Sequence, residues 1–173
     1  MSDDLALARK AIASVPFMSG YSGPIVRQGG LTNLVFQAGD HCIRVPGKGT
    51  EEYINRANEA VAAREAAKAG VSPDVLYFDD NGVMVTRFVD GAQTMSPAAF
   101  KLNEGAPARA GEAFRKLHTS GAVFPFRFYL FSMIDDYLKI LSTKDVVLPK
   151  GYHDVLKEAE DIRTALSMHP LTL

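Results

Sequence analysis

Two adjacent glycines, a strand arginine and a helical glutamate are the residues of this chain whose types and spacing could do chemistry. Gly29 and Gly30 lie in a turn between two apolar runs, where backbone N–H groups can approach phosphate oxygens. Arg44 follows in the next apolar run, and Glu59 lies further on in a helical pattern, where its carboxylate can hold the guanidinium. A glycine-rich turn near a cation that an acid orients is suited to binding the phosphates of a nucleotide. These residues therefore predict half of a nucleotide-binding site.

Strand alternation favours a buried role for Arg44. In Cys42-Ile43-Arg44-Val45 the arginine lies on the face opposite Ile43 and Val45, and a charge in an otherwise apolar strand needs a partner. Glu59 is the candidate partner, and the alternative is an outward arginine in water. Cys42, the only cysteine of the chain, is predicted to be a small core residue.

A second set of candidate residues ends the last apolar run of the sheet-rich part. In Arg87-Phe88-Val89-Asp90-Gly91 free backbone groups could pair with the edge of a purine ring. The alternative is an ordinary connector, and spacing alone does not decide between the two.

The first half of the chain contains the elements that must position these residues. A leading helix is expected behind Asp3 and Asp4, ending at Pro16. Thr50 is a plausible N-cap for a second helix that begins at Glu51 and runs to Gly70. Asn81-Gly82 predicts a tight hairpin turn, because such turns need a positive φ. Strands are predicted over residues 25–30, 33–38, 41–46, 75–78 and 83–89.

The second half of the chain is predicted to be helical. Apolar residues recur at helical spacing after Gly91, and Pro170 is expected to close the last helix. The pattern indicates an α+β protein with a five-stranded antiparallel sheet and one inserted helix, followed by a helical part. We expect two lobes, residues 1–90 and 91–173, with a cleft where the chain crosses between them.

Composition and charge narrow the class of partner. The chain has 173 residues, of which 47% are hydrophobic, and its net charge is −1 with a pI near 6.4. No general basic surface exists to attract nucleic acid or an anionic membrane, so a small-molecule partner is favoured. The start Met1-Ser2-Asp3-Asp4-Leu5 lacks the pattern of a signal peptide, and we expect a cytoplasmic protein.

Taken together, these segments resemble the choline kinase family, within the aminoglycoside phosphotransferase-like small-molecule kinases. The resemblance covers residues 25–121 and rests on the order of the pieces, from the glycine turn through Ile43-Arg44-Val45-Pro46-Gly47 to the helix ending at Gly121. It implies a protein-kinase-like upper lobe, the first helices of a lower lobe, ATP with Mg²⁺, and a choline-like amino alcohol as substrate. By this resemblance, the residues that bind ATP are Gly29, Gly30, Thr32 and Asn33 over the phosphates, Arg44 in contact with them, Glu59 orienting Arg44, and the backbone of Arg87 and Val89 at adenine.

The catalytic half of such a site is missing from the sequence. The family places its catalytic aspartate in a His-x-Asp loop and a metal-binding aspartate soon after, and neither pattern occurs here. We expect both beyond residue 173, in which case the chain is truncated and by itself inactive, with no catalytic or metal-binding residue to assign. The alternative is a noncatalytic, kinase-like interaction or regulatory module, which would self-associate through exposed helical faces.

Overall fold

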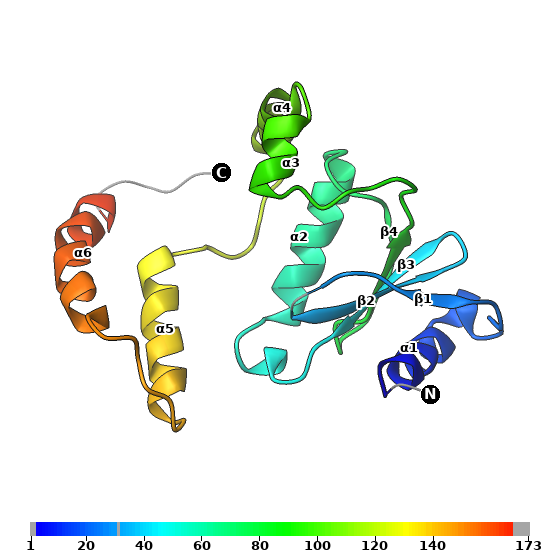
Figure 1. Cartoon of the computed structure of the whole chain (residues 1–173), viewed down its shortest axis with the longest axis horizontal. Helices are drawn as coiled ribbons and strands as arrows, with labels where there is room; N and C mark the ends of the chain where they lie inside the picture. The colour runs from blue at the N-terminus through cyan, green and yellow to red at the C-terminus, as the bar shows by residue number, and fades with distance from the viewer. Residues whose placement is uncertain (1–2, 31, 168–173) are drawn as a thin grey trace. The chain divides into compact units, whose positions relative to one another are not determined.

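The computed structural model describes residues 3–30 and 32–167, and these residues fall into two compact units that divide between Pro125 and Phe126. The first unit contains the sheet and helices α1 to α4, and the second contains α5 and α6 (Figure 1). The predicted boundary after residue 90 separates the two lobes of a kinase, which is a different division from these compact units, and it stays a prediction. Pro170, which was expected to close the last helix, lies outside the described residues.

The sheet has five strands, and every neighbouring pair is antiparallel, as predicted. The spatial order is β1-β2-β3-β5-β4, so the last two strands enter the sheet with β5 beside β3. Gly82, in the turn between β4 and β5, has φ +87°, which is the positive value that the hairpin prediction required. The strands are β1 (Ile25–Arg27), β2 (Asn33–Ala38), β3 (His41–Pro46), β4 (Val75–Phe78) and β5 (Met84–Arg87), so β1 and β5 are shorter than predicted.

Two helices cover opposite faces of the sheet (Figure 1). Helix α1 (Asp3–Ser14) and the short 3₁₀ helix η1 (Pro16–Met18) pack on the face that carries Ile43 and Val85, both fully buried. Helix α2 (Arg56–Lys68), which is inserted between β3 and β4, lies on the face that carries Arg44. Successive residues of β3 alternate between the two faces of the sheet. This one strand therefore contributes to the core under α1 and also carries Arg44 toward α2.

Helix α2 begins five residues later than predicted, and Thr50 is not its N-cap. Residues Thr50–Glu52 form a separate 3₁₀ helix, η2, in which the Thr50 hydroxyl donates to the carbonyl oxygen of Gly47. Asn55 caps α2 instead, because its side chain accepts a hydrogen bond from the backbone N–H of Asn58. The later start places Arg56 in the first turn of the helix beside Glu59.

The remaining helices confirm the predicted change to helical structure. They are α3 (Pro97–Leu102), α4 (Ala106–His118), α5 (Leu130–Ser142) and α6 (Tyr152–Ser167). Sequence patterning did not predict α3, although Ser96 accepts a hydrogen bond from Ala99 N–H and Pro97 occupies the first turn, both of which are helix-start signals.

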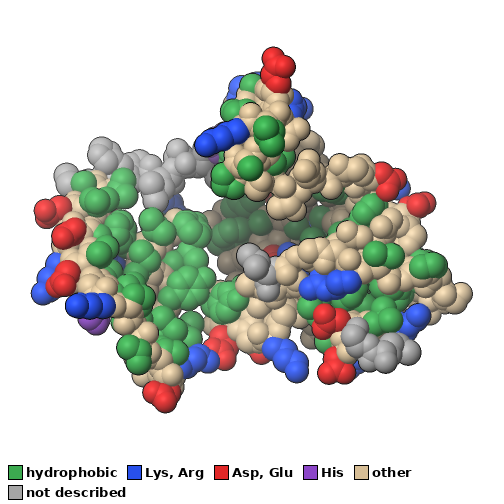
Figure 2. Space-filling model, in the orientation of Figure 1, with side chains coloured by type: hydrophobic (Ala, Val, Ile, Leu, Met, Phe, Trp, Pro, Cys, Tyr) green, Lys and Arg blue, Asp and Glu red, His purple; other side chains and the backbone are tan. Residues whose placement is uncertain are grey.

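Helices α5 and α6 leave much of their apolar surface uncovered within their unit. Arg163 on α6 donates to the backbone carbonyl of Phe131 and to Asp135, both on α5. Neither helix has a fully buried residue, and Figure 2 shows hydrophobic side chains over this unit. Among the described helices, none combines the length and hydropathy that crossing a membrane requires. Large apolar side chains exposed on α5 and α6 are Leu130, Tyr137, Val155, Ile162 and Leu166.

Candidate functional site

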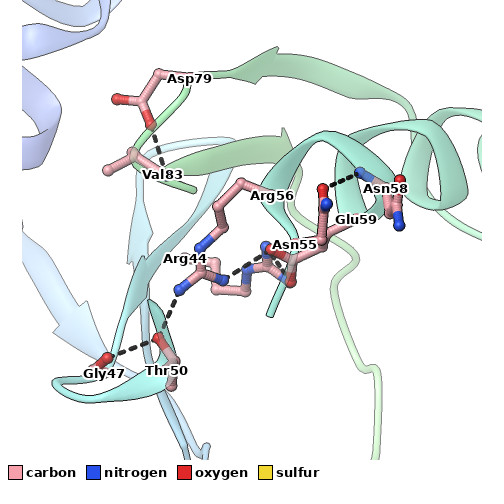
Figure 3. Close-up of polar contacts among 9 residues, drawn as sticks. All are labelled: Arg44, Gly47, Thr50, Asn55, Arg56, Asn58, Glu59, Asp79 and Val83. Carbon is pink, nitrogen blue, oxygen red and sulfur yellow. Dashed lines mark hydrogen bonds and ion pairs between the residues drawn. The ribbon is translucent and has the colours of Figure 1, made fainter. Parts of the chain in front are cut away.

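The Arg44–Glu59 ion pair joins β3 to the first turn of α2 (Figure 3). Arg44 Nη2 lies 2.8 Å from Glu59 Oε1, and each side chain keeps 19% of its surface exposed. Arg44 is therefore not an outward arginine in water. The structure brings the predicted cation and carboxylate together, while their contact with phosphate stays a prediction.

A second arginine, which the sequence reasoning missed, shares the same carboxylate. Arg56 Nη1 donates to Glu59 Oε2 at 2.8 Å, and its Nη2 donates to Thr50 Oγ1 at 2.5 Å (Figure 3). The hydroxyl of Thr50 in turn donates to the carbonyl oxygen of Gly47 at 2.8 Å. The three-residue spacing of Arg56 and Glu59 within one helix was the signal that could have revealed this contact.

The cluster has an unpaired donor, Arg44 Nε, and one more positive than negative charge. Two guanidinium groups, of Arg44 and Arg56, share the single carboxylate of Glu59. Arg44 Nη2 faces Glu59 Oε1 in an ion pair that lies outside hydrogen-bond geometry, and the buried Nε of Arg44 has no acceptor among the described residues. Buried donors without acceptors cost free energy, and an anion would supply both acceptors and charge. The cluster is therefore suited to an anionic ligand.

The glycine-rich turn lies tightly against the end of β3. Gly30 has φ +123°, and a Cβ there would lie 2.3 Å from the carbonyl oxygen of Asn33. A Cβ on Gly47, just after β3, would lie only 1.9 Å from the carbonyl oxygen of Thr32. Because no side chain fits at such distances, both positions require glycine. The shape of the turn is thus fixed by backbone packing on the strand that carries Arg44.

A cavity of about 450 Å³ lies beside this turn, within the first unit. Its volume is in the range of small-molecule sites. Only some of the predicted site residues line this cavity. Gly29, Gly30, Arg87 and Val89 line the cavity, whereas Thr32, Asn33, Arg44 and Glu59 are not part of the lining.

Cys42 lines the same cavity, so the prediction of a core residue is wrong. Its side chain is only partly buried, and it lies across from Thr86 in the pairing of β3 with β5. Burial raises the pKa of the Cys42 thiol, and this effect exceeds the lowering by the hydrogen bond with Thr86 and by the charge of Arg44. The thiol is therefore a protonated, slowly reacting group at neutral pH.

The described residues offer no ligand set for a metal ion. No group of three or more His, Cys, Asp or Glu side chains is placed to hold one in residues 3–30 and 32–167. Asp135, one of two adjacent aspartates on α5, pairs with Arg163.

Comparison with known proteins shows which solved structures this chain resembles. The scan against protein-family models and the search of curated proteins gave no match. Among solved structures, a choline/ethanolamine kinase family protein from Mesorhizobium loti is 67% identical, with 97% of this chain covering 55% of that one and a TM-score of 0.81. The choline kinase LicA from Streptococcus pneumoniae is 20% identical, with coverages of 94% and 57% and a TM-score of 0.72.

A second LicA structure, in complex with AMP, is 21% identical, with coverages of 84% and 50% and a TM-score of 0.66. At that identity LicA supports the fold, whereas the Mesorhizobium protein supports the sequence relationship as well. The chain spans about half the length of the solved relatives that it matches. Over the residues that it spans, this chain is similar in sequence and in fold to a choline/ethanolamine kinase family protein, and it has the fold of the choline kinase LicA.

Proposed function

We propose that this chain supplies the nucleotide-binding part of an ATP-dependent kinase acting on the hydroxyl group of choline, ethanolamine or a related small amino alcohol. The observation that carries the proposal is the Arg44–Glu59 pair, whose arginine keeps an unpaired donor at Nε, in a chain 67% identical to a choline/ethanolamine kinase family protein. The AMP complex of LicA, which has the same fold, supports an adenine nucleotide as the ligand.

In this proposal, different residues bind the phosphates and the adenine of ATP. The backbone of Gly29, Gly30, Thr32 and Asn33 covers the phosphates, and Arg44 meets their charge while Glu59 orients it. The backbone of Arg87 and Val89, which line the 450 Å³ cavity, receives the adenine edge. In phosphoryl transfer a bound Mg²⁺ neutralises phosphate charge, and a carboxylate accepts the proton of the substrate hydroxyl.

Location and partners follow from the same proposal. A kinase that consumes ATP belongs in the cytoplasm, where a single, partly buried thiol such as Cys42 stays reduced. With a net charge of −1, the chain has no excess of positive charge to attract nucleic acid or an anionic membrane, and a small-molecule partner fits this activity. The exposed apolar residues of α5 and α6 favour the alternative, a noncatalytic module that self-associates.

Binding and turnover are tested separately. MgATP binding to the 173-residue chain is measured by calorimetry, and phosphorylation of choline and ethanolamine is measured on the product of the complete reading frame. Binding together with ATP-dependent phosphorylation supports the kinase. Binding without turnover in the complete protein, with self-association in ultracentrifugation, would support the noncatalytic module instead.

Arg44→Ala should weaken MgATP binding about ten- to a hundredfold. Losing one charge-assisted contact costs roughly 1.5 to 3 kcal/mol, and 1.4 kcal/mol is tenfold in affinity. The matched control is Arg115→Ala, which removes an exposed arginine paired with Glu112 on α4. Calorimetric titration measures both variants. Equal affinities for wild type and Arg44→Ala would refute the role given to this arginine.

Cys42 should react slowly with iodoacetamide, and more slowly still when ATP is bound. Since burial raises the pKa of the thiol, the thiolate fraction at pH 8 is smaller in the folded chain than in urea, and it rises as the pH increases. Cys42 also lines the cavity assigned to the nucleotide. Mass spectrometry follows labelling of this single cysteine. Labelling that MgATP leaves unchanged would argue against a nucleotide in this cavity.

A further inference from the structure

Arg56 is enclosed by three segments of the first unit. It lies in the first turn of α2 and its side chain is only 13% exposed. One nitrogen reaches Glu59 and another reaches Thr50 in η2. From the third side, the tip of the β4–β5 hairpin closes over it, since a Cβ on Gly82 would lie 2.7 Å from Arg56 Nε. Such burial of a charged side chain is unusual unless its contacts have a use.

The two oxygens of Glu59 are divided between two arginines. Oε2 accepts from Arg56 in good geometry at 2.8 Å, whereas Oε1 faces Arg44 Nη2 at the same distance without a hydrogen bond. A hydrogen bond at one oxygen restricts the rotation of a carboxylate, which limits where its second oxygen can lie. The contact with Arg56 therefore determines the position of the charge that Arg44 meets.

Arg56 also reaches the glycine-rich turn through a chain of contacts. It donates to Thr50 Oγ1, Thr50 donates to the carbonyl of Gly47, and Gly47 lies against the carbonyl of Thr32. Thr50 is only 2% exposed, so the hydroxyl has no competing water. The planar fork of arginine serves Thr50 and Glu59 at once, which the single ammonium of lysine cannot do with the same geometry.

We propose that Arg56 is a positioning residue for the phosphate site: it fixes Glu59 toward Arg44 and anchors the Gly47–Thr50 turn beneath the glycine-rich turn. It acts on the triphosphate through these neighbours and contacts no ligand. This inference rests on the proposed function. It adds Arg56 as the residue that holds both Arg44 and the Gly47–Thr50 turn in place.

Arg56→Lys tests the inference, because it keeps the charge and removes the fork. Titrations with MgATP and with adenosine compare wild type, Arg56→Lys and the control Arg64→Lys. Arg64 is an exposed arginine of the same helix that lies over the ring of Phe78 and makes no ion pair in the described part of the chain. We expect MgATP affinity to fall about tenfold in Arg56→Lys with adenosine affinity unchanged, and both affinities to stay at wild-type values in Arg64→Lys.

The outcomes separate the inference from the function on which it rests. A wild-type chain that binds neither ligand overturns the proposed function and the inference together. If wild type binds MgATP and Arg56→Lys binds it equally well, or loses MgATP and adenosine affinity alike, the positioning role alone is overturned. Should Arg56→Lys fail to fold, as thermal melting would show, Thr50→Val leaves Arg56 in place and removes the hydroxyl that joins it to the carbonyl of Gly47. That variant must then lose MgATP affinity severalfold and retain adenosine affinity.

Discussion

Glu59→Gln is expected to reduce the free energy of unfolding by about 3 kcal/mol, because removing one partner of a buried ion pair leaves uncompensated charge. The guanidinium groups of Arg44 and Arg56 would then face each other across a neutral amide. The figure lies at the low end for such changes, since Glu59 keeps 19% of its side chain exposed. Urea unfolding of wild type and variant measures the difference.

The same substitution should also weaken MgATP binding more than tenfold, since Arg44 loses the acid that orients it. The matched control is Glu112→Gln on α4, where the carboxylate accepts two hydrogen bonds from Arg115 three residues later. That pair lies on an exposed helix surface, so we expect the urea midpoint to stay unchanged. If both variants shift the midpoint equally, the cluster around Glu59 is no more than an ordinary surface pair.

Gly47→Ala is the second substitution with a large expected effect. Its Cβ would lie 1.9 Å from the backbone carbonyl oxygen of Thr32, so either the glycine-rich turn or the end of β3 must move. We expect a loss of roughly 1 to 3 kcal/mol in unfolding free energy, as for overpacked cores. Displacement of the turn should lower MgATP affinity at least tenfold, which titration would measure.

Gly111→Ala is the control, for which we expect the free energy of unfolding to rise instead of fall. Gly111 lies inside α4, and a Cβ there meets nothing within 4 Å. Alanine at this position should stabilise the first unit by roughly 0.5 to 1 kcal/mol through helix propensity. A Gly47→Ala variant as stable as wild type would contradict the close packing of the turn on β3.

Local patterns in the sequence were sufficient to predict the antiparallel sheet and the Arg44–Glu59 ion pair. Asn81-Gly82 predicted the hairpin, because a positive φ is a property of the backbone at that position alone. Alternation along β3 placed Arg44 opposite the core, and the acid on the following helix was the partner that a charge on that face required.

Choices among competing local signals could not be made from the sequence. Thr50 and Asn55 are both good helix caps, and the choice depends on the carbonyl of Gly47, which accepts the threonine hydroxyl. The spacing of Arg56 and Glu59 was a usable signal for their contact. The approach of Arg56 to the hairpin tip at Gly82, and of Cys42 to the lining near Arg87, comes from segments distant in sequence. Those approaches are tertiary, so spacing along the chain carries little information about them.

The order of the chain has a consequence for how this protein is made. Every residue that lines the cavity comes from residues 28–94, and the supporting α1 precedes them. A polypeptide leaving the ribosome therefore holds every piece of the pocket before α4, α5 and α6 have emerged. Under the proposed function, cellular nucleotide is then a ligand for the nascent protein and stabilises the first unit while synthesis continues.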